Sequence, residues 1–204
     1  SIGGPKSEAV NSAITRLTNA GIVVVAAAGN ENTDACTKSP ASTPSAITVG
    51  ATTIVDAKSS YSNFGSCVDI NAPGSSITGA WFGSTTATNT ISGTSMATPH
   101  VTGAVAVYLG LKPTASVLEA TNFIDAESTK DAITGLPAGT VNKLLYVSPT
   151  DGGAPVVAPV VGMKSVTNIT HQSADVNIDV NPGYAPTALS FEYATDAAMT
   201  TPVA

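Results

Sequence analysis

The feature that most constrains the fold is an unbroken apolar run at residues 22–28, Ile-Val-Val-Val-Ala-Ala-Ala. Apolarity that does not alternate predicts a strand buried on both faces, as in a parallel sheet covered by helices. Residues 7–20 before it predict a helix, because Ser7 suits the N-cap, Glu8 the first turn and Gly21 the end. A helix followed by a buried strand is half of an α/β unit. The apolar residues at helical spacing are Val10, Ile14 and Leu17.

Further segments continue the α/β pattern up to residue 147. Residues 46–51, 68–70 and 143–147 are predicted strands, and a helix is predicted to begin near Ser95 and to end at Gly110. A second helix is predicted over residues 114–124. Its inward face is expected to carry Val117, Leu118, Thr121 and Ile124.

The composition changes at Ser148 and divides the chain into three predicted parts. Residues 1–147 form the α/β domain, and residues 148–159, rich in Pro, Gly and Asp, predict an extended linker. Residues 160–204 include the alternating stretch 174–180, which is typical of antiparallel strands. Since a complete sandwich needs about 100 residues, we expect this last part to be a truncated β-sandwich module.

The overall composition predicts a folded, secreted protein. Hydrophobic residues make up 43% of the chain and charged residues 11%, which is the balance of a packed domain. The formal net charge of −6 and the lack of a Lys/Arg cluster argue against nucleic acid as a partner. No apolar run is long enough to span a bilayer. We expect a monomeric extracellular protein, because sparse charge and abundant small polar residues suit that location.

Two cysteines, Cys36 and Cys67, lie in polar, turn-rich segments. One alternative is a pair of free buried thiols, although buried thiols usually lie in apolar runs. The polar surroundings favour a disulfide, which implies an oxidising compartment.

The most informative stretch is Gly-Thr-Ser-Met-Ala-Thr-Pro-His-Val at residues 93–101. Ser95 is predicted to lie where a loop becomes a helix, with free backbone N–H groups facing any negative charge that develops beside it. Gly93 and Ala97 leave its hydroxyl accessible, and Pro99 is expected in the first turn, where proline is tolerated. Such a serine suits acyl transfer when a base is present. The alternative is an ordinary serine at a helix start.

This stretch resembles, nearly residue for residue, the nucleophile motif of the subtilase family of serine proteases. Residues 39–51, 61–65 and 72–74 resemble its proteinase K-type branch, and the resemblance covers about residues 1–147. It implies the C-terminal half of a subtilisin-like domain, a parallel sheet with helices on both faces, in an endopeptidase whose nucleophile is Ser95. The tail from Val160 resembles the start of a fibronectin type III-like module.

The resemblance also implies roles in binding polypeptide substrates. Ala-Ala-Ala-Gly-Asn at residues 26–30 resembles the strand that ends in the family's oxyanion-hole asparagine, so Asn30 and the backbone N–H of Ser95 are expected to hold the oxyanion. Without the Ser95 motif, Asn30 would be interpreted as part of a turn. Small residues are expected to form two walls of a pocket for a large apolar or aromatic P1 side chain: Ser1, Ile2, Gly3, Ala27, Ala28 and Gly29.

In the proteinase K-type branch, a calcium ion is held by two backbone carbonyls and an aspartate. The matching positions are Pro44, Ala46 and Asp69, and such hard oxygen ligands suit calcium. The alternative is an aspartate that pairs with local N–H groups. Cys36 and Cys67 also match a disulfide found in some bacterial members of the branch.

A subtilase triad runs Asp, His, Ser along the chain, and the first two are missing here. No His precedes Ser95, and the first Asp is Asp34, so the catalytic Asp and His are expected upstream of Ser1, where the sequence opens without Met. His100 is expected to face away from Ser95 and to be structural. The chain alone is therefore predicted to be inactive.

Two other functions are compatible with parts of this sequence. One is a non-catalytic, subtilase-like binding domain, which the upstream residues would distinguish from an enzyme. The other is an α/β-hydrolase, which is disfavoured because its nucleophile lies in Gly-x-Ser-x-Gly, whereas Ser95 lies in Gly-Thr-Ser-Met-Ala.

Overall fold

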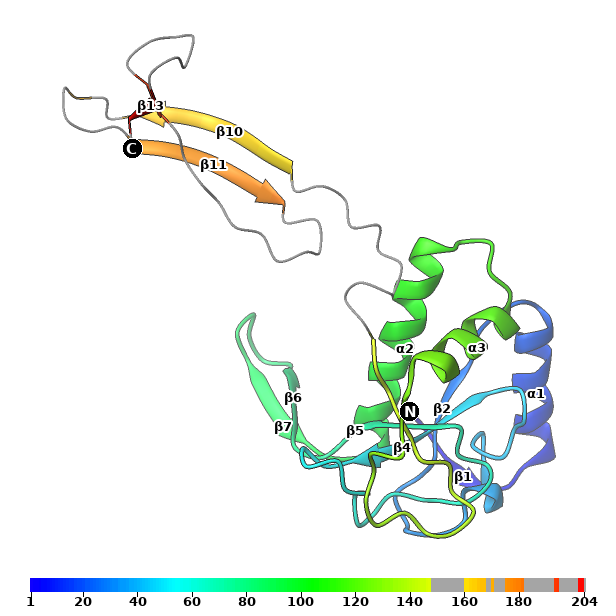
Figure 1. Cartoon of the computed structure of the whole chain (residues 1–204). Helices are drawn as coiled ribbons and strands as arrows, with labels where there is room; N and C mark the ends of the chain where they lie inside the picture. The colour runs from blue at the N-terminus through cyan, green and yellow to red at the C-terminus, as the bar shows by residue number, and fades with distance from the viewer. Residues whose placement is uncertain (148–159, 168–169, 171–174, 182–192, 195–201, 204) are drawn as a thin grey trace. The chain divides into compact units, whose positions relative to one another are not determined.

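A computed structural model describes residues 1–147, 160–167, 170, 175–181, 193–194 and 202–203. The chain divides into two compact units, Ser1–Gly152 and Gly153–Ala204. The first unit contains the α/β elements (Figure 1).

The described residues of the second unit form two antiparallel strand pairs. β10 (Val160–Thr167) pairs with β11 (Asp175–Asn181), and β12 (Tyr193–Ala194) pairs with β13 (Pro202–Val203). Antiparallel pairing of β11 agrees with the alternation in its sequence. The predicted linker at residues 148–159 lies outside the described residues, and the fibronectin type III-like module stays a prediction.

A five-stranded sheet forms the centre of the first unit, in the order β2–β4–β5–β9–β8. Its first four strands run parallel, which confirms the α/β prediction, and β8 is antiparallel to β9. The strands are β2 (Val25–Ala27), β4 (Ile47–Thr52), β5 (Ile70–Pro73), β9 (Lys143–Leu144) and β8 (Thr129–Lys130).

Three strands differ clearly in extent from the sequence expectation, and one of them is β9, which ends at Leu144 instead of Val147. The apolar run from Ile22 pairs only from Val25 onward, and Ile22 itself is exposed. The strand expected at residues 68–70 begins at Ile70, because the Val68 N–H is held in a turn by the carbonyl of Gly65.

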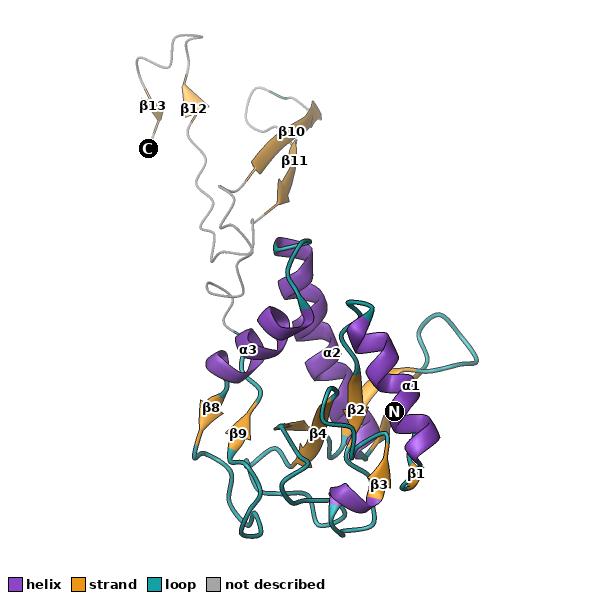
Figure 2. Cartoon of the chain, turned by 90° about the vertical axis from the view of Figure 1, so that its right-hand side faces the viewer, coloured by secondary structure: helices purple, strands orange, loops and turns teal. Residues whose placement is uncertain are grey.

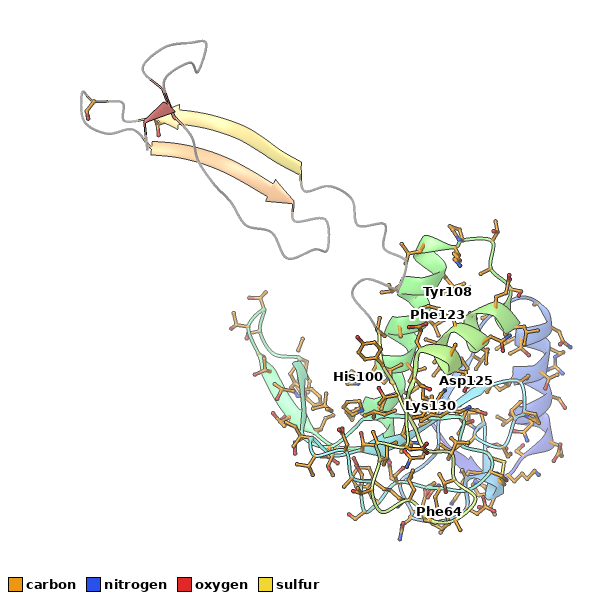
Figure 3. All side chains as sticks on the ribbon, viewed as in Figure 1. Phe64, His100, Tyr108, Phe123, Asp125 and Lys130 are labelled. Carbon is orange, nitrogen blue, oxygen red and sulfur yellow. A yellow bond between two sulfur atoms is a disulfide. The ribbon has the colours of Figure 1, made fainter. Side chains whose placement is uncertain are left out.

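Helix α2 (Thr94–Leu111) is the helix that builds the main core. It packs along β2, β4 and β5, and α3 (Val117–Glu127) packs against it through the stacked rings of Tyr108 and Phe123, whose centroids are 4.3 Å apart (Figure 3). Buried side chains of the sheet and the two helices meet there, among them Val49, Ala51, Ile70, Val101 and Ile124. The inward face expected for α3 is wrong at Leu118, which is 68% exposed.

Helix α1 (Glu8–Asn19) begins and ends where the sequence predicts. The Ser7 hydroxyl accepts a hydrogen bond from the Val10 N–H, and Gly21, at φ +85°, follows the C-terminus. The predicted apolar face is wrong in part, because Val10 and Leu17 are exposed.

The buried face of α1 is polar instead. Asn11, 8% exposed, donates from Nδ2 to Ser42 and accepts at Oδ1 from the hydroxyls of Ser39 and Thr43. Because buried polar groups are costly unless they are hydrogen-bonded, this network replaces the apolar contact that the sequence suggested.

Shorter elements complete the first unit. β1 (Gly4–Pro5) pairs with β3 (Lys38–Ser39), which follows the 3₁₀ helix η1 (Ala35–Thr37). Figure 2 shows α1 with β1 and β3 at one side of the unit and β8 with β9 at the other. β6 (Ile77–Ala80) and β7 (Thr88–Ile91) form a hairpin that extends from the body (Figure 1). None of the described helices is long and apolar enough to cross a membrane.

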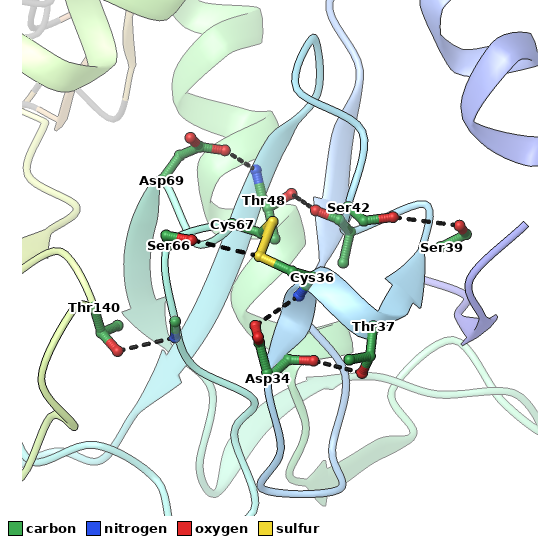
Figure 4. Close-up of a disulfide and its surroundings, with 12 residues drawn as sticks. Asp34, Cys36, Thr37, Ser39, Ser42, Thr48, Ser66, Cys67, Asp69 and Thr140 are labelled. Carbon is green, nitrogen blue, oxygen red and sulfur yellow. Dashed lines mark hydrogen bonds between the residues drawn. A yellow bond between two sulfur atoms is a disulfide. The ribbon is translucent and has the colours of Figure 1, made fainter. Parts of the chain in front are cut away.

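The structure confirms the disulfide between Cys36 and Cys67 (Figure 4). The two Cα atoms are 5.3 Å apart, and the sequence separation of the two cysteines is 31. The bond joins η1 to the segment that precedes β5.

Replacing Cys36 and Cys67 together with serine is expected to lower the free energy of unfolding by about 3–4 kcal/mol, because the cross-link removes loop-closure entropy from the unfolded chain. Urea unfolding of the oxidised protein and of the double variant measures the difference. Equal midpoints and equal slopes for the two proteins would show that the disulfide does not stabilise the fold.

Candidate active site

Ser95 lies at the start of α2, as predicted. Gly93 is the N-cap and has no side chain of its own with which to cap the helix. Ser95 is half-buried, and its hydroxyl lies 3.5 Å from the carbonyl oxygen of Ser1. The N–H groups of Thr94, Met96 and Ala97 have acceptors, whereas the described residues offer none to the Ser95 N–H. The helix N-terminus therefore carries a reachable serine hydroxyl next to one available backbone N–H.

The expectation that Pro99 lies in the first turn is wrong. Pro99 lies inside α2, four residues after Ser95, where an ordinary residue would donate its N–H to the Ser95 carbonyl. Since proline has no N–H, that carbonyl remains available, and it accepts a hydrogen bond of 3.0 Å from the Ser1 hydroxyl. Proline at position 99 thus leaves the Ser95 carbonyl free to bind the Ser1 hydroxyl.

The side chain of Asn30 is fixed by Thr94, the residue before Ser95. Its Oδ1 accepts two hydrogen bonds of 2.8 Å, from the backbone N–H and from the hydroxyl of Thr94. The Thr94 hydroxyl also accepts from the Gly29 N–H at 3.2 Å. With its oxygen held in this way, Asn30 must turn its amide nitrogen away from Thr94.

The amide nitrogen of Asn30 and the backbone nitrogen of Ser95 lie around one point. A Cβ placed on Gly93 would be 3.5 Å from Asn30 Nδ2 and 3.6 Å from the Ser95 nitrogen. The part of the chain that the structure describes gives Nδ2 no hydrogen-bond acceptor. Both nitrogens therefore lie close to the space that the missing Gly93 side chain leaves open.

The residues predicted to wall a substrate pocket have mixed surroundings. Ala27, the last residue of β2, and Ala28 after it are buried, and Gly29 is half-buried. Ser1 contacts Ser95, whereas the side chain of Ile2 is 81% exposed. The structure thus brings Ser1 and the end of β2 to the same helix terminus, and the two walls stay a prediction.

His100 is hydrogen-bonded within α2. Its Nδ1 lies 2.8 Å from the carbonyl oxygen of Met96, in agreement with the structural role expected for it. His100 lies on the side of α2 that faces the β6–β7 hairpin (Figure 3). Its ring lines a cavity together with Trp81 and Met96. No contact between His100 and Ser95 is found among the described side chains.

Comparison with known proteins now identifies the family. The model of the Subtilase family matches residues 1–143. The chain belongs to the subtilase family. The serine at the start of α2 and the asparagine that follows β2 are therefore parts of a subtilase domain.

Individual subtilases agree with this assignment. The chain is 52% identical over 146 residues to the extracellular serine proteinase of Thermus sp. (strain Rt41A), a match that covers 72% of this chain and 36% of the relative. It is 47% identical over 146 residues to the cuticle-degrading protease of Metarhizium anisopliae, covering 72% and 37%. This chain therefore spans about a third of the length of such relatives.

A solved structure supports the fold as well. The crystal structure of a cold-adapted subtilisin-like serine proteinase matches with a TM-score of 0.68 and 46% sequence identity, over 71% of this chain and 52% of that chain. The α/β unit thus has a subtilisin-like fold with a parallel sheet.

Asp69 is the carboxylate of the predicted calcium site. Its Oδ2 accepts a hydrogen bond of 2.7 Å from the Thr48 N–H, two residues after Ala46 (Figure 4). Within the described ranges Oδ1 has no hydrogen-bond donor, so one hard oxygen is available for a cation. Pro44 lines a cavity next to α1, and Asp69 lines a different one next to α3. The donor types fit calcium, and the joint site stays a prediction.

The surroundings of Asp69 raise its pKa. Asp69 keeps contact with solvent, but neighbouring atoms crowd the carboxylate, and this desolvation is the largest cause of the shift. The Thr48 N–H and the charge of Lys143 act in the opposite direction, and Asp125 adds to the increase.

Sequence reasoning assigned no role to two residues that shape the subtilase site, Thr94 and Asn63. Thr94 lies inside the nucleophile motif and holds Asn30, and it is fully buried. Asn63 lies in the segment 61–65 that resembles the family, and it binds the turn around Asn30. Both residues are polar and lie inside segments that resemble the family, and this was the available signal. The sequence could not show what they bind, because the partners of their side chains lie 30 or more residues away.

The raised pKa of Asp69 predicts a pH-dependent stability difference between the calcium-free protein and its Asp69→Asn variant. As the pH rises above 3.8, the ordinary value, Asp69 ionises first in the unfolded chain, so the native state of the wild type loses stability until the pH passes the raised pKa. The variant has no such loss. Its stability relative to wild type should therefore rise across this range and then level off.

Urea unfolding of both proteins in EDTA across this pH range measures the difference. Titrating groups that do not interact with Asp69 cancel in the comparison. A difference that stays constant with pH would contradict the shift.

Proposed function

We propose that the protein is a serine endopeptidase that hydrolyses polypeptides through an acyl-enzyme on Ser95. The observation that carries the proposal is the convergence of Asn30 Nδ2 and the Ser95 backbone nitrogen beside the nucleophile. Membership in the subtilase family supports the same reaction class.

In the proposed reaction, a base takes the proton of the Ser95 hydroxyl while Oγ attacks the scissile carbonyl carbon. The carbonyl oxygen gains negative charge and accepts hydrogen bonds from Asn30 Nδ2 and the Ser95 N–H. Collapse of the tetrahedral intermediate breaks the peptide bond, and the protonated base gives its proton to the leaving amine. Water then attacks the ester by the same route and frees Ser95.

The general base and its aspartate are proposed to come from residues outside this sequence. The chain has two histidines, His100 and His171. His171 lies outside the described residues, and His100 is bound to the Met96 carbonyl. The 204 residues by themselves are therefore proposed to be inactive.

Substrate choice and location follow from the same proposal. Ala27, Ala28 and Gly29 have small side chains or none, which leaves room for a large apolar or aromatic P1 side chain. The disulfide suits an oxidising compartment, and one relative is named an extracellular serine proteinase. We therefore propose a secreted protein, and the expectation that it is a monomer stays a prediction.

Replacing Asn30 with alanine in the full-length protein is expected to lower kcat by about 10²–10³ with little change in KM, because the oxyanion forms only after attack. The magnitude is that measured for the oxyanion asparagine of subtilisin, a member of this family. Hydrolysis of a chromogenic peptide with an apolar P1 residue measures kcat and KM.

Ser95→Ala is the matched control, and it should abolish both turnover and labelling by a fluorophosphonate. The 204-residue chain should show no turnover that depends on Ser95. A full-length protein that binds peptides without Ser95-dependent cleavage would replace the protease proposal with a binding domain.

A structural calcium ion is proposed at Asp69 and the backbone carbonyls of Pro44 and Ala46. Oδ1 of Asp69, which has no donor within the described part of the chain, supports the proposal. The ion would supply positive charge that offsets the desolvation of the carboxylate.

Calcium is expected to raise the melting temperature of the wild type and to leave that of Asp69→Asn unchanged, because the variant lacks the carboxylate ligand. At a concentration 100 times the Kd, binding stabilises by about 2.7 kcal/mol. Thermal unfolding in calcium and in EDTA measures the effect. Asp56→Asn is the control: Asp56 is exposed, and asparagine tolerates its φ of +54°. An equal calcium response in all three proteins would place the ion elsewhere.

A further inference from the structure

One buried side chain, Asn63, binds the turn that carries Asn30. Asn63 is 2% exposed and lies in the segment of the sequence that connects β4 to β5. Its Nδ2 donates to the Ala28 carbonyl and to Glu31 Oε2, both at 2.8 Å. Its Oδ1 accepts from the backbone N–H groups of Glu31 at 3.1 Å and Thr33 at 2.9 Å. Both donors of the amide and the acceptor capacity of its oxygen are thus used.

The turn fits closely around this amide. Gly29 has a φ of +104°, and a Cβ on it would lie 2.3 Å from Asn63 Nδ2. The backbone N–H of Asn63 donates to the Gly29 carbonyl at 2.9 Å. Asn63 therefore holds the backbone on both sides of Asn30 and does not bond to the Asn30 side chain itself.

Two separate attachments consequently define where the Asn30 amide points. Thr94 holds the side-chain oxygen from the helix, and Asn63 holds the backbone from the opposite segment. Removal of either attachment lets Nδ2 move relative to the Ser95 nitrogen. Displacements of about 1 Å in an active site can cost 10²-fold in rate.

We infer that Asn63 is a positioning residue that aligns the Asn30 amide with the developing oxyanion. The inference rests on the proposed function. It assigns Asn63 an effect on kcat that is separate from its effect on stability.

The charge of Glu31 supports this arrangement. The hydrogen bond from Asn63 is the largest cause that lowers the pKa of Glu31, and Lys38, whose Nζ lies 3.6 Å from Oε2, lowers it further. The lowered pKa favours the ionised form of Glu31, which is a strong acceptor for Asn63. Since Glu31 directly follows Asn30, this bond fixes the turn on that side of Asn30.

The test is a double-mutant cycle in the full-length protein, with Asn63→Ala, Asn30→Ala and the pair. We expect Asn63→Ala to lower kcat by about 10- to 100-fold, within the loss that removal of the whole donor causes, and to change KM by less than about twofold. In the Asn30→Ala background the same substitution should leave kcat unchanged, because no amide remains to be aligned.

Two further variants separate positioning from folding. Asn71→Ala is the matched control: Asn71 is also 2% exposed, and its amide donates to the carbonyl of Val141. The Asn71→Ala variant should be less stable than the wild type but should keep the same kcat per active site. Active sites are counted by complete labelling with a fluorophosphonate. Asn63→Asp keeps an acceptor, loses both donors and adds a carboxylate that repels Glu31, so it should also lower kcat per labelled site.

The outcomes are distinguishable. Wild type without Ser95-dependent turnover overturns the proposed function and the inference together. An active wild type with unchanged kcat per site in Asn63→Ala or Asn63→Asp overturns only the inference. The inference is also overturned if Asn63→Ala lowers kcat by the same factor in the wild type and in the Asn30→Ala variant.

Discussion

The buried hydroxyl of Thr94 connects the sheet to the helix that carries Ser95. It donates to Asn30 Oδ1 and accepts from the Gly29 N–H, so one side chain binds two residues that follow β2. A buried polar group without a partner costs about 1–3 kcal/mol. The bonds of Thr94 therefore hold the start of α2 against the segment that follows β2, and the geometry of the candidate site depends on them.

This connection is possible because small residues let the backbones approach each other. The Gly93 N–H donates to the Gly74 carbonyl at 2.9 Å, just after β5. A Cβ on Gly74 would lie 2.6 Å from the Cβ of Ala51 and 2.8 Å from the Gly93 carbonyl oxygen. A larger residue at Gly74 would push α2 away from the sheet and separate Thr94 from Asn30. Close packing and the candidate site thus depend on the same contact.

The sequence predicted those features that local patterns encode. The apolar runs around Ala27 and Val49 indicated parallel strands, and the motif around Ser95 indicated the start of a helix. It failed where long-range polar contacts decide. The polar docking of α1 through Asn11 and the hydrogen bonds of Asn63 join segments about 30 residues apart or more, and neither amide has a periodic neighbour that would reveal its burial.

The disulfide and Asn63 act on the same pair of segments at different distances from Asn30. Between them, backbone hydrogen bonds run from Phe64 to Thr33 and from Ala35 to Phe64, so residues 29–37 lie along residues 61–67. Cys36 and Cys67 close the far end of this pairing (Figure 4). A covalent bond at that end limits separation of the segments but does not orient an amide at the other end. Orientation requires the directional hydrogen bonds of Asn63 and Thr94, and it therefore depends on these two side chains rather than on the cross-link.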